Sequence, residues 1–243
     1  MPGVALSGLV VYFYVMKRLN GADSSAQTLT NKAYLSIKDL IMSYTLKPGE
    51  IVSEIELARK LQMSRTPVHQ ALLHLKRDGF LETTEGPGWK VYSLSLVDIR
   101  QIFAVKIAIE NIIMEEAALR ENSSKEGIRL CLERMQKAAS ERNIDKWIKL
   151  DHELHDTIDA LASNSRAVRI SESLNEQLYR FQSRYPPLDL AQRQREHDII
   201  VDCILSGDAR GAQLNHERSL NQLREEMEYV LRKMVFPLTN DQV

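Results

Sequence analysis

The sequence predicts a mainly α-helical protein: an N-terminal winged helix-turn-helix of three helices plus a β-hairpin, then an all-α bundle of about six helices. Apolar residues recur at three- and four-residue steps along most of the chain, as they do on one face of a helix. Alternation typical of strands is confined to the short stretch 80–92. A length of 243 residues with 44% apolar and 27% charged residues is enough for two modest globular domains.

We expect four segments: an N-terminal extension over 1–30, the winged module over 31–93, the helical module over 95–236 and a tail over 237–243. The extension has an apolar stretch at 4–16, followed by two cations. A bilayer span needs about 20 apolar residues, and a signal peptide places its positive charge first, so no membrane partner is predicted. Two explanations stay open: residues 1–15 are a mis-called start, or they form an apolar arm that packs on a partner subunit.

The two cysteines also limit the class of protein. Cys131 and Cys203 are far apart, and each lies within a helical apolar pattern with no CxxC pair. Thiols used in this way are typical of a reduced compartment, so we expect a cytoplasmic protein.

The winged module begins with two helices. Tyr34, Ile37 and Ile41 repeat at helical spacing and predict a helix over 31–44, which ends at the Pro48-Gly49 turn. Ser53 precedes a second helix, and Glu56 three residues later predicts a capping box.

The third helix follows the short turn Gln62-Met63-Ser64. Ser64 is a good N-cap, and Pro67 falls in the first turn, where a missing N–H costs little. Val68 and the apolar residues after it pack inward, whereas Ser64, Arg65 and Thr66 form a polar tip. This division suits a recognition helix that reads DNA with its N-terminal residues. A capped surface helix with one Arg is the commoner alternative for the tip alone.

A β-hairpin wing follows Gly79, which ends the third helix. Residues 80–83 and 89–92 are predicted strands, joined through Gly86-Pro87-Gly88. Gly88 allows close approach and Lys90 lies nearby, so the hairpin is expected to contact phosphates or a minor groove. Residues 31–92 carry nine Lys/Arg against seven Asp/Glu, in a chain whose formal net charge is -1. The excess has the sign that DNA binding requires but is too small to indicate it without the motif.

The helical module is predicted from six amphipathic stretches with polar or glycine-containing breaks. They cover roughly 96–120, 125–141, 144–162, 165–183, 189–206 and 208–234. In the first, the expected core face consists of Ile102, Val105, Ile109, Ile112 and Ile113. Lys106 and Glu110 lie one turn apart, and their spacing alone predicts a surface ion pair.

Three of these helices carry candidate metal ligands. Asp151 and His155 are four residues apart, so both side chains project from the same face of one helix. His197 and His216 lie on two later helices. Brought together in a bundle core, these groups would form a nitrogen and oxygen site for zinc, nickel or manganese. An Asp and a His at this spacing more often form a solvated contact on the helix surface than a metal site.

The winged module resembles the N-terminal domain of the GntR family of bacterial transcription regulators. The resemblance is carried in order and without gaps by Pro48-Gly49-Glu50, Ser53-Glu54, Glu56-Leu57-Ala58, Leu61, Ser64-Arg65-Thr66-Pro67-Val68, Ala71-Leu72, Leu75 and Asp78-Gly79. It implies binding to a double-stranded DNA operator with an inverted repeat, with Arg65 on a base edge and Ser64 and Thr66 on phosphate or sugar. His69 and Ile55 stand where the family usually has Arg, so its usual operator sequence is not expected to carry over.

The helical module resembles the FCD effector domain of the FadR-type subgroup. The matching residues are Lys106, Glu110, Asp151-His152-Glu153-Leu154-His155, Asn164, Glu196-His197, Gly207-Asp208 and Ala212. The resemblance implies metal ligation by Asp151, His155 and His197, and effector binding near Lys106, Glu110 and Asn164. The family's fourth ligand would fall at Ser219, whereas this chain has His216 one turn earlier. Either His216 ligates, or Ser219, water or an effector carboxylate completes the shell.

From these features we expect a homodimeric, non-enzymatic transcription regulator, of the repressor type, that responds to a small-molecule effector such as an organic acid. Dimerisation follows from the symmetry of the operator. Two alternatives remain: a regulator whose ligand pocket works without metal, and a metal-dependent hydrolase. The hydrolase is disfavoured because the sequence offers no separate general base or nucleophile and includes a complete DNA-binding module.

Overall fold

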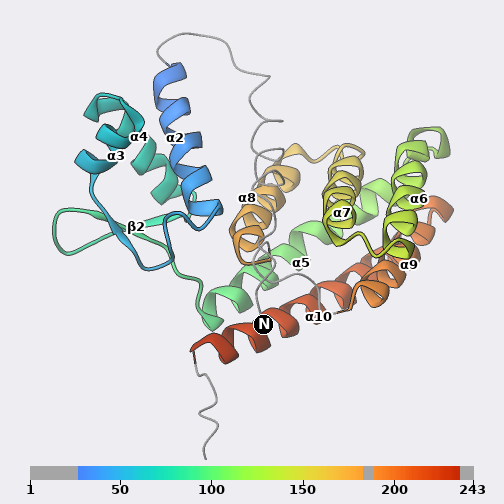
Figure 1. Cartoon of the computed structure of the whole chain (residues 1–243). Coiled ribbons are helices and arrows are strands. Elements are labelled where there is room, and N and C mark those ends of the chain that lie inside the picture. Colours follow the sequence, from blue (N-terminus) through green and yellow to red (C-terminus); the bar gives the residue numbers. More distant parts are fainter. Residues whose placement is uncertain (1–26, 183–188, 236–243) are drawn as a thin grey trace, which may run out of the picture. The chain divides into compact units, whose positions relative to one another are not determined.

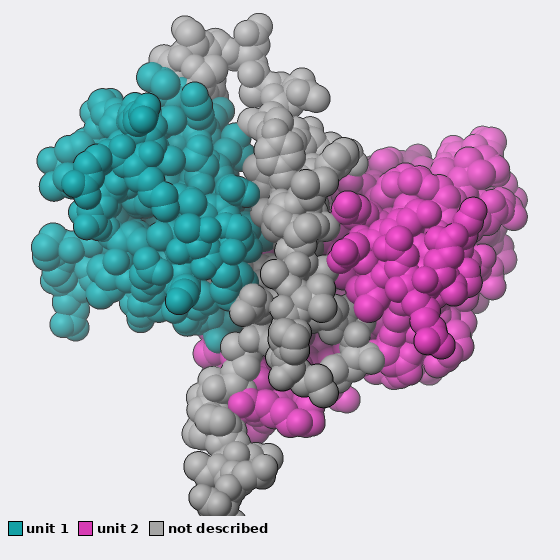
Figure 2. Space-filling model, in the orientation of Figure 1, with its two compact units in different colours: residues 1–94 teal, residues 95–243 magenta. Residues whose placement is uncertain are grey.

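The computed structural model describes residues 27–182 and 189–235. The chain divides into two compact units, residues 1–94 and 95–243, which are coloured separately in Figure 2. The predicted apolar arm and the tail over 237–243 lie outside the described residues.

The helices of the first unit are α2 (Gln27–Met42), α3 (Glu54–Leu61) and α4 (Arg65–Arg77). Helix α2 begins four residues earlier than its apolar spacing predicted. Its Ile37 and Ile41 are fully buried, as are Leu72 and Leu75 of α4. These aliphatic side chains form the core that fixes α4 to the rest of the unit.

The starts of α3 and α4 differ in detail from the expectation. Ser53 and Ser64 occupy the N-cap positions with extended backbones, but neither side chain makes a capping hydrogen bond. The capping box predicted between Ser53 and Glu56 is therefore wrong. Glu56 and the first residues of α4 are exposed, so water can satisfy the free N–H groups of both first turns. Between the helices, Gln62 adopts a left-handed conformation with φ of 54°, which makes the turn tight.

The sheet of the first unit has three antiparallel strands in the order β1-β3-β2, namely β1 (Ile51–Val52), β2 (Leu81–Thr83) and β3 (Trp89–Val91). The hairpin β2–β3 is the predicted wing. Strand β1 was not predicted, because two residues are too few to show an alternating pattern. Gly88 has φ of 145°, and a Cβ there would lie 3.0 Å from the Ile51 side chain. A glycine at this position therefore lets β1 pack closely against the hairpin.

The second unit consists of helices: α5 (Leu96–Ala118), the short 3-10 helix η2 (Asn122–Lys125), α6 (Glu126–Ser140), α7 (Ile144–Asp159), α8 (Ser165–Gln182), α9 (Leu190–Ser206) and α10 (Ala209–Val235). The long helices α5 and α10 lie side by side, and α7 packs against α6 (Figure 1). A capping box of Ser95 and Asp98 starts α5. Within the described ranges, none of the helices contains an apolar stretch of the length that a membrane span requires.

Helix α5 buries only part of the predicted face. Ile102 and Ile113 are buried as predicted and Ile109 packs against the core, whereas Val105 and Ile112 are 48% and 38% exposed. Phe103, which was not predicted, is fully buried. Lys106 and Glu110 are 4% and 3% exposed, so the predicted surface ion pair is in fact a buried one. The helix is apolar on more than one face, and for such a helix periodicity does not reveal which face meets its neighbours.

Candidate DNA-binding tip and buried histidine cluster

The polar tip of α4 is exposed as the sequence predicted. Ser64, Arg65 and Thr66 are all exposed at the start of the helix, and the Arg65 side chain is 68% accessible. Its Nε atom donates a hydrogen bond of 3.2 Å to Oε1 of Glu54 on α3. The guanidinium is thus held at one nitrogen, while its terminal nitrogens are available to a ligand.

His69 lies one turn further along α4 and is held by two other elements. Its Nδ1 is 2.8 Å from Oε2 of Glu54, and its ring meets the Trp89 ring of β3 edge-on, with centroids 6.2 Å apart. Burial, which would raise the pKa of Glu54, is outweighed by the hydrogen bonds and charges of His69 and Arg65, which lower that pKa. Glu54 was not among the predicted site residues, although it directly follows the N-cap Ser53.

The two wing residues of the prediction lie on the hairpin. Lys90 of β3 pairs across the strands with Glu82 of β2, with Nζ and Oε1 2.7 Å apart, and both residues are half-buried. The carbonyls of Gly86 and Gly88 accept hydrogen bonds from the Thr84 hydroxyl, at 2.6 and 3.2 Å. These bonds fix the shape of the hairpin tip.

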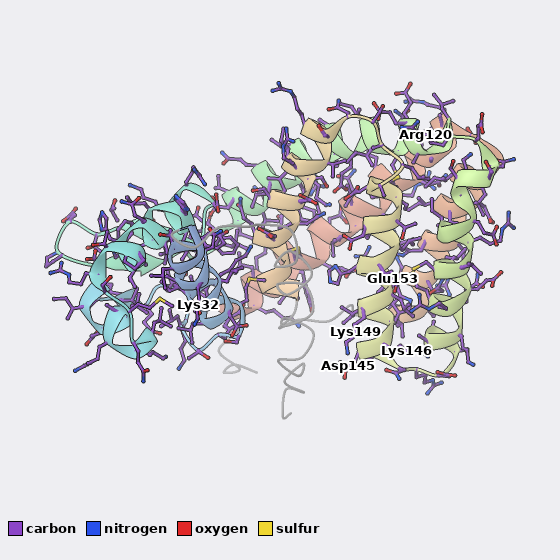
Figure 3. The ribbon with its side chains drawn as sticks, turned by 90° about the horizontal axis from the view of Figure 1, so that it is seen from above. Lys32, Arg120, Asp145, Lys146, Lys149 and Glu153 are labelled. Atoms are coloured by element: carbon purple, nitrogen blue, oxygen red, sulfur yellow. The ribbon has the colours of Figure 1, made fainter. Side chains whose placement is uncertain are left out.

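In the second unit, α7 and α9 bring three predicted ligands together. One potential ligand atom from each of Asp151, His155 and His197 lies within 4.8 Å of the others. Oδ1 of Asp151 is 2.7 Å from Nε2 of His197 and 3.8 Å from Nε2 of His155. Figure 3 labels Asp145, Lys146, Lys149 and Glu153 along the same helix α7.

The orientation of His197 leaves Nε2 directed at this cluster. Its Nδ1 is 2.7 Å from the backbone carbonyl of Arg193, which can only accept, so Nδ1 carries the proton. The ring also packs edge-on against buried Trp147, with centroids 5.5 Å apart. Oδ1 of Asp151 is a buried atom that faces Nε2 of both His197 and His155. A carboxylate oxygen facing imidazole nitrogens in this way fits a divalent cation held between them.

Burial and mutual charge shift the pKa values of the cluster in different directions. Burial lowers the pKa of His155 to about 4. Burial would also lower the pKa of His197, but the charge and hydrogen bond of Asp151 outweigh it and raise that pKa. For Asp151, burial is opposed by the charge of His197, and its pKa falls well below the usual range. An ionised Asp151 and a neutral His155 are the protonation states that metal ligation requires, whereas His197, whose raised pKa favours a proton on the nitrogen facing Asp151, would release that proton when a metal binds.

The structure places His216 beside the cluster. Its ring centroid is 6.2 Å from that of His155, but its Nε2 lies 2.8 Å from Oε2 of Glu110. Glu110 also binds Lys106 and accepts a hydrogen bond of 2.5 Å from Ser171. Lys106 in turn donates to Asn175 at 2.5 Å. Two of the predicted effector-binding residues, Lys106 and Glu110, are thus partners within one buried network.

Ser219, at the position where the family's fourth ligand would fall, is engaged elsewhere. Its hydroxyl donates to Oε2 of Glu196 at 2.7 Å, and the buried guanidinium of Arg193 lies 3.4 Å from its Oγ. Arg193 was not predicted as a site residue. Its position four residues before His197 was the available signal, because such residues share a helix face.

Asn164, the third predicted effector-binding residue, lies at the start of α8. Its side-chain oxygen accepts from the N–H of Ala167 at 3.1 Å, while its own N–H donates to Glu116 of α5 at 3.0 Å. The first contact is typical of a helix N-cap, and the second links the start of α8 to α5.

Comparison with known proteins gives two family matches. Residues 101–228 match the FCD domain, and residues 29–91 match the bacterial regulatory proteins of the gntR family. An HTH-type transcriptional regulator of Agrobacterium vitis, in the TAR-I ttuE-ttuC' intergenic region, is 32% identical over 152 residues, which are 61% of this chain and 89% of that protein. The HTH-type transcriptional repressor RspR of Escherichia coli is 23% identical over 214 residues, 86% of this chain and 91% of that one. The E. coli McbR/YncC structure is similar in fold, with a TM-score of 0.64, 18% identity and coverage of 84% of this chain and 98% of that chain.

Proposed function

This chain belongs to the GntR family of bacterial regulatory proteins, with an FCD domain as its second module, and from that premise we propose an operator-binding repressor controlled by a metal-dependent effector site. Members of the family are transcription regulators and not enzymes, as the sequence predicted, which excludes the hydrolase alternative. The proposal for the effector site rests on the proximity of Asp151, His155 and His197.

Operator binding is assigned to α4 and the wing. The exposed tip of Ser64, Arg65 and Thr66 offers a cation and two hydroxyls at the start of a helix whose other face is buried. Arg65 suits a guanine, because its terminal nitrogens match the O6 and N7 acceptors. Ser64 and Thr66 suit phosphate or sugar oxygens, and Lys90 with Gly88 suits the backbone beside the wing.

Asp151, His155 and His197 would hold the metal. One carboxylate and two imidazoles suit zinc, nickel or manganese. The carbonyl of Arg193 fixes the orientation of His197, as outer-shell partners do in metal sites. When bound, the cation would offer a positively charged coordination position to an anionic ligand. With Ser219 engaged by Glu196, and with His216 engaged by Glu110, three protein ligands are the set that these contacts favour.

The effector is proposed to be an organic acid. The sequence predicted that Lys106 would bind the carboxylate of the effector, but the charge of Lys106 is already balanced by Glu110. The stronger attraction for a carboxylate therefore comes from the metal position, and Lys106 with Asn175 supplies further polar groups of the site. A coupling of about 1–3 kcal/mol between effector and operator binding is the usual size for such a regulator.

A homodimer in the cytoplasm is proposed as the working form. An inverted-repeat operator needs two recognition helices, and one module alone offers too few base contacts for a tight site. The exposed apolar residues Val97, Val105 and Ile112 on α5 support a subunit interface in the helical unit. Cys131 and Cys203 are free thiols, which agrees with a reduced compartment.

The test uses the full chain and its own operator, selected from a randomised duplex library. Metal content of the purified dimer is measured by mass spectrometry, and operator affinity by fluorescence anisotropy with zinc, nickel or manganese and then with citrate as a probe carboxylate. We expect His197→Ala to abolish metal binding and the citrate response while operator binding without citrate persists. Wild-type metal content in both His155→Ala and His197→Ala would overturn the metal site, and a citrate response that survived in them would favour a metal-independent pocket.

A further inference from the structure

We propose that Glu54 fixes His69 as a hydrogen-bond acceptor, so that this position of the recognition helix selects a base with a donor in the major groove, adenine or cytosine. The inference rests on the proposed operator binding and adds a specificity rule to it. It concerns a position where the resemblance leads one to expect an Arg, and it assigns to Glu54 the role of a positioning residue.

The contact with Glu54 determines which nitrogen of the His69 imidazole carries the proton. Nδ1 of His69 is 2.8 Å from Oε2 of Glu54. An ionised carboxylate only accepts hydrogen bonds, so Nδ1 must be the protonated nitrogen. The low pKa of Glu54 keeps the carboxylate ionised. In the neutral ring, Nε2 then has the lone pair and can only accept.

Two neighbouring elements hold the His69 ring in place. Glu54 on α3 holds one edge, and Trp89 on β3 meets the ring at an interplanar angle of 65°. The side chain is 47% exposed on the same helix that presents Arg65. Within the part of the chain that the structure describes, Nδ1 is the ring atom with a hydrogen-bond partner, and Nε2 is left for a ligand. Contacts from two other elements reduce the entropy that His69 would lose on binding a base edge.

The bases differ in the donors and acceptors that they present in the major groove. In the major groove adenine N6 and cytosine N4 are donors, whereas guanine O6 and N7 and thymine O4 are acceptors. An Arg has only donors and pairs best with guanine. A neutral His69 whose Nδ1 is taken up by Glu54 offers Nε2 as an acceptor, which is the opposite polarity, and it matches adenine or cytosine. Glu54 also accepts a hydrogen bond of 3.2 Å from Nε of Arg65, so one carboxylate positions two neighbouring side chains for base contact, a donor and an acceptor.

Base preference is measured by selection from a randomised duplex library at pH 8, where imidazole side chains are ordinarily neutral. For the wild-type dimer we expect one position of each half-site to prefer adenine or cytosine. His69→Arg should move that preference to guanine. Glu54→Gln should reduce it at least five-fold, because an amide can also donate and no longer fixes the tautomer.

The matched control is Glu56→Gln, which makes the same charge change at an exposed position of the same helix. It should leave the preferred bases unchanged. A second readout is the 15N spectrum of histidine-labelled protein without DNA: we expect protonated Nδ1 in the wild type and a shift toward protonated Nε2 in Glu54→Gln. Thermal melting of each variant establishes that it is folded.

The outcomes separate the inference from the proposed function. A wild-type protein that selects no sequence would overturn operator binding itself, and with it the inference. A wild-type protein that selects an operator but prefers guanine at the position that His69→Arg alters would overturn the inference alone. Glu54→Gln with unchanged base preference and an unchanged 15N spectrum would also overturn it.

Discussion

Nε2 of His216 lies 2.8 Å from Oε2 of Glu110, and this contact between α10 and α5 occupies the nitrogen that would otherwise be available to the metal cluster. Both side chains are buried. Glu110 also balances the charge of Lys106. Burial would raise the pKa of Glu110, but the charges of Lys106 and His216 outweigh this effect and hold that pKa well below the usual range. His216 is therefore engaged outside the cluster of Asp151, His155 and His197, although its ring lies beside that of His155.

Replacement of His216 should affect metal binding less than replacement of His197. For His216→Gln we expect the wild-type metal stoichiometry and an affinity reduced by less than about 10-fold, an effect no larger than that of an outer-shell partner. His197→Gln removes a proposed ligand and should abolish stoichiometric binding. Isothermal titration with zinc measures both. Equal losses in the two variants would instead identify His216 as a ligand.

Arg65→Ala should strongly weaken specific operator binding and leave metal content unchanged. Loss of a bidentate guanine contact costs about 1–3 kcal/mol in each half-site, so the dimer should lose at least about 30-fold in operator affinity. Arg77→Ala is the matched control, because Arg77 is exposed in the last turn of the same helix. Anisotropy with the selected operator and with a scrambled duplex separates specific from non-specific binding. A similar loss in Arg77→Ala would show that bulk charge, and not the Arg65 contact, sets the affinity.

Asp159→Asn should stabilise the protein in a pH-dependent way. Burial and the nearby charge of Glu110 raise the pKa of Asp159 to about 7. Between about pH 4, where an unfolded Asp titrates, and pH 7 the folded state keeps a proton that the unfolded state has lost, so stability falls as pH rises. The variant lacks this penalty. Its gain over the wild type in urea unfolding should be small at pH 4 and reach on the order of 1–3 kcal/mol at pH 8.

Asp202→Asn serves as the control for this pH experiment, because Asp202 is exposed on α9. Its effect on the free energy of unfolding should be the same at both pH values. A gain in Asp159→Asn that did not grow with pH would contradict the raised pKa.

Lys125→Met should destabilise the helical unit. The buried Nζ of Lys125 donates to the carbonyls of Ala118 and Ile204, at 2.8 and 2.7 Å, near the ends of α5 and α9. Met fills similar space but leaves these two acceptors without the cation, which should cost about 2 kcal/mol or more in the free energy of unfolding. Lys137→Met on the exposed face of α6 is the control, with an expected change within about 0.5 kcal/mol. Equal effects of the two substitutions would contradict a special role for Lys125.

The sequence by itself determined the features that depend on residues close together in the chain. Helical spacing located the helices, and the alternating stretch after Gly79 located the wing. Ser64 and Pro67 marked the start of α4, and the four-residue step placed Asp151 and His155 on one face of α7. These features follow from local backbone geometry, which the order of residues fixes directly.

Only the tertiary structure decided which residues from distant segments meet. Glu54 and His69 are 15 residues apart, and Glu110 and His216 are 106 apart, and neither pairing appears in any local pattern. Burial of Lys106 and Glu110 likewise depends on which face of α5 meets its neighbouring helices. Such contacts are set by helix packing across the unit, and a buried ion pair persists there because both charges find partners of good geometry.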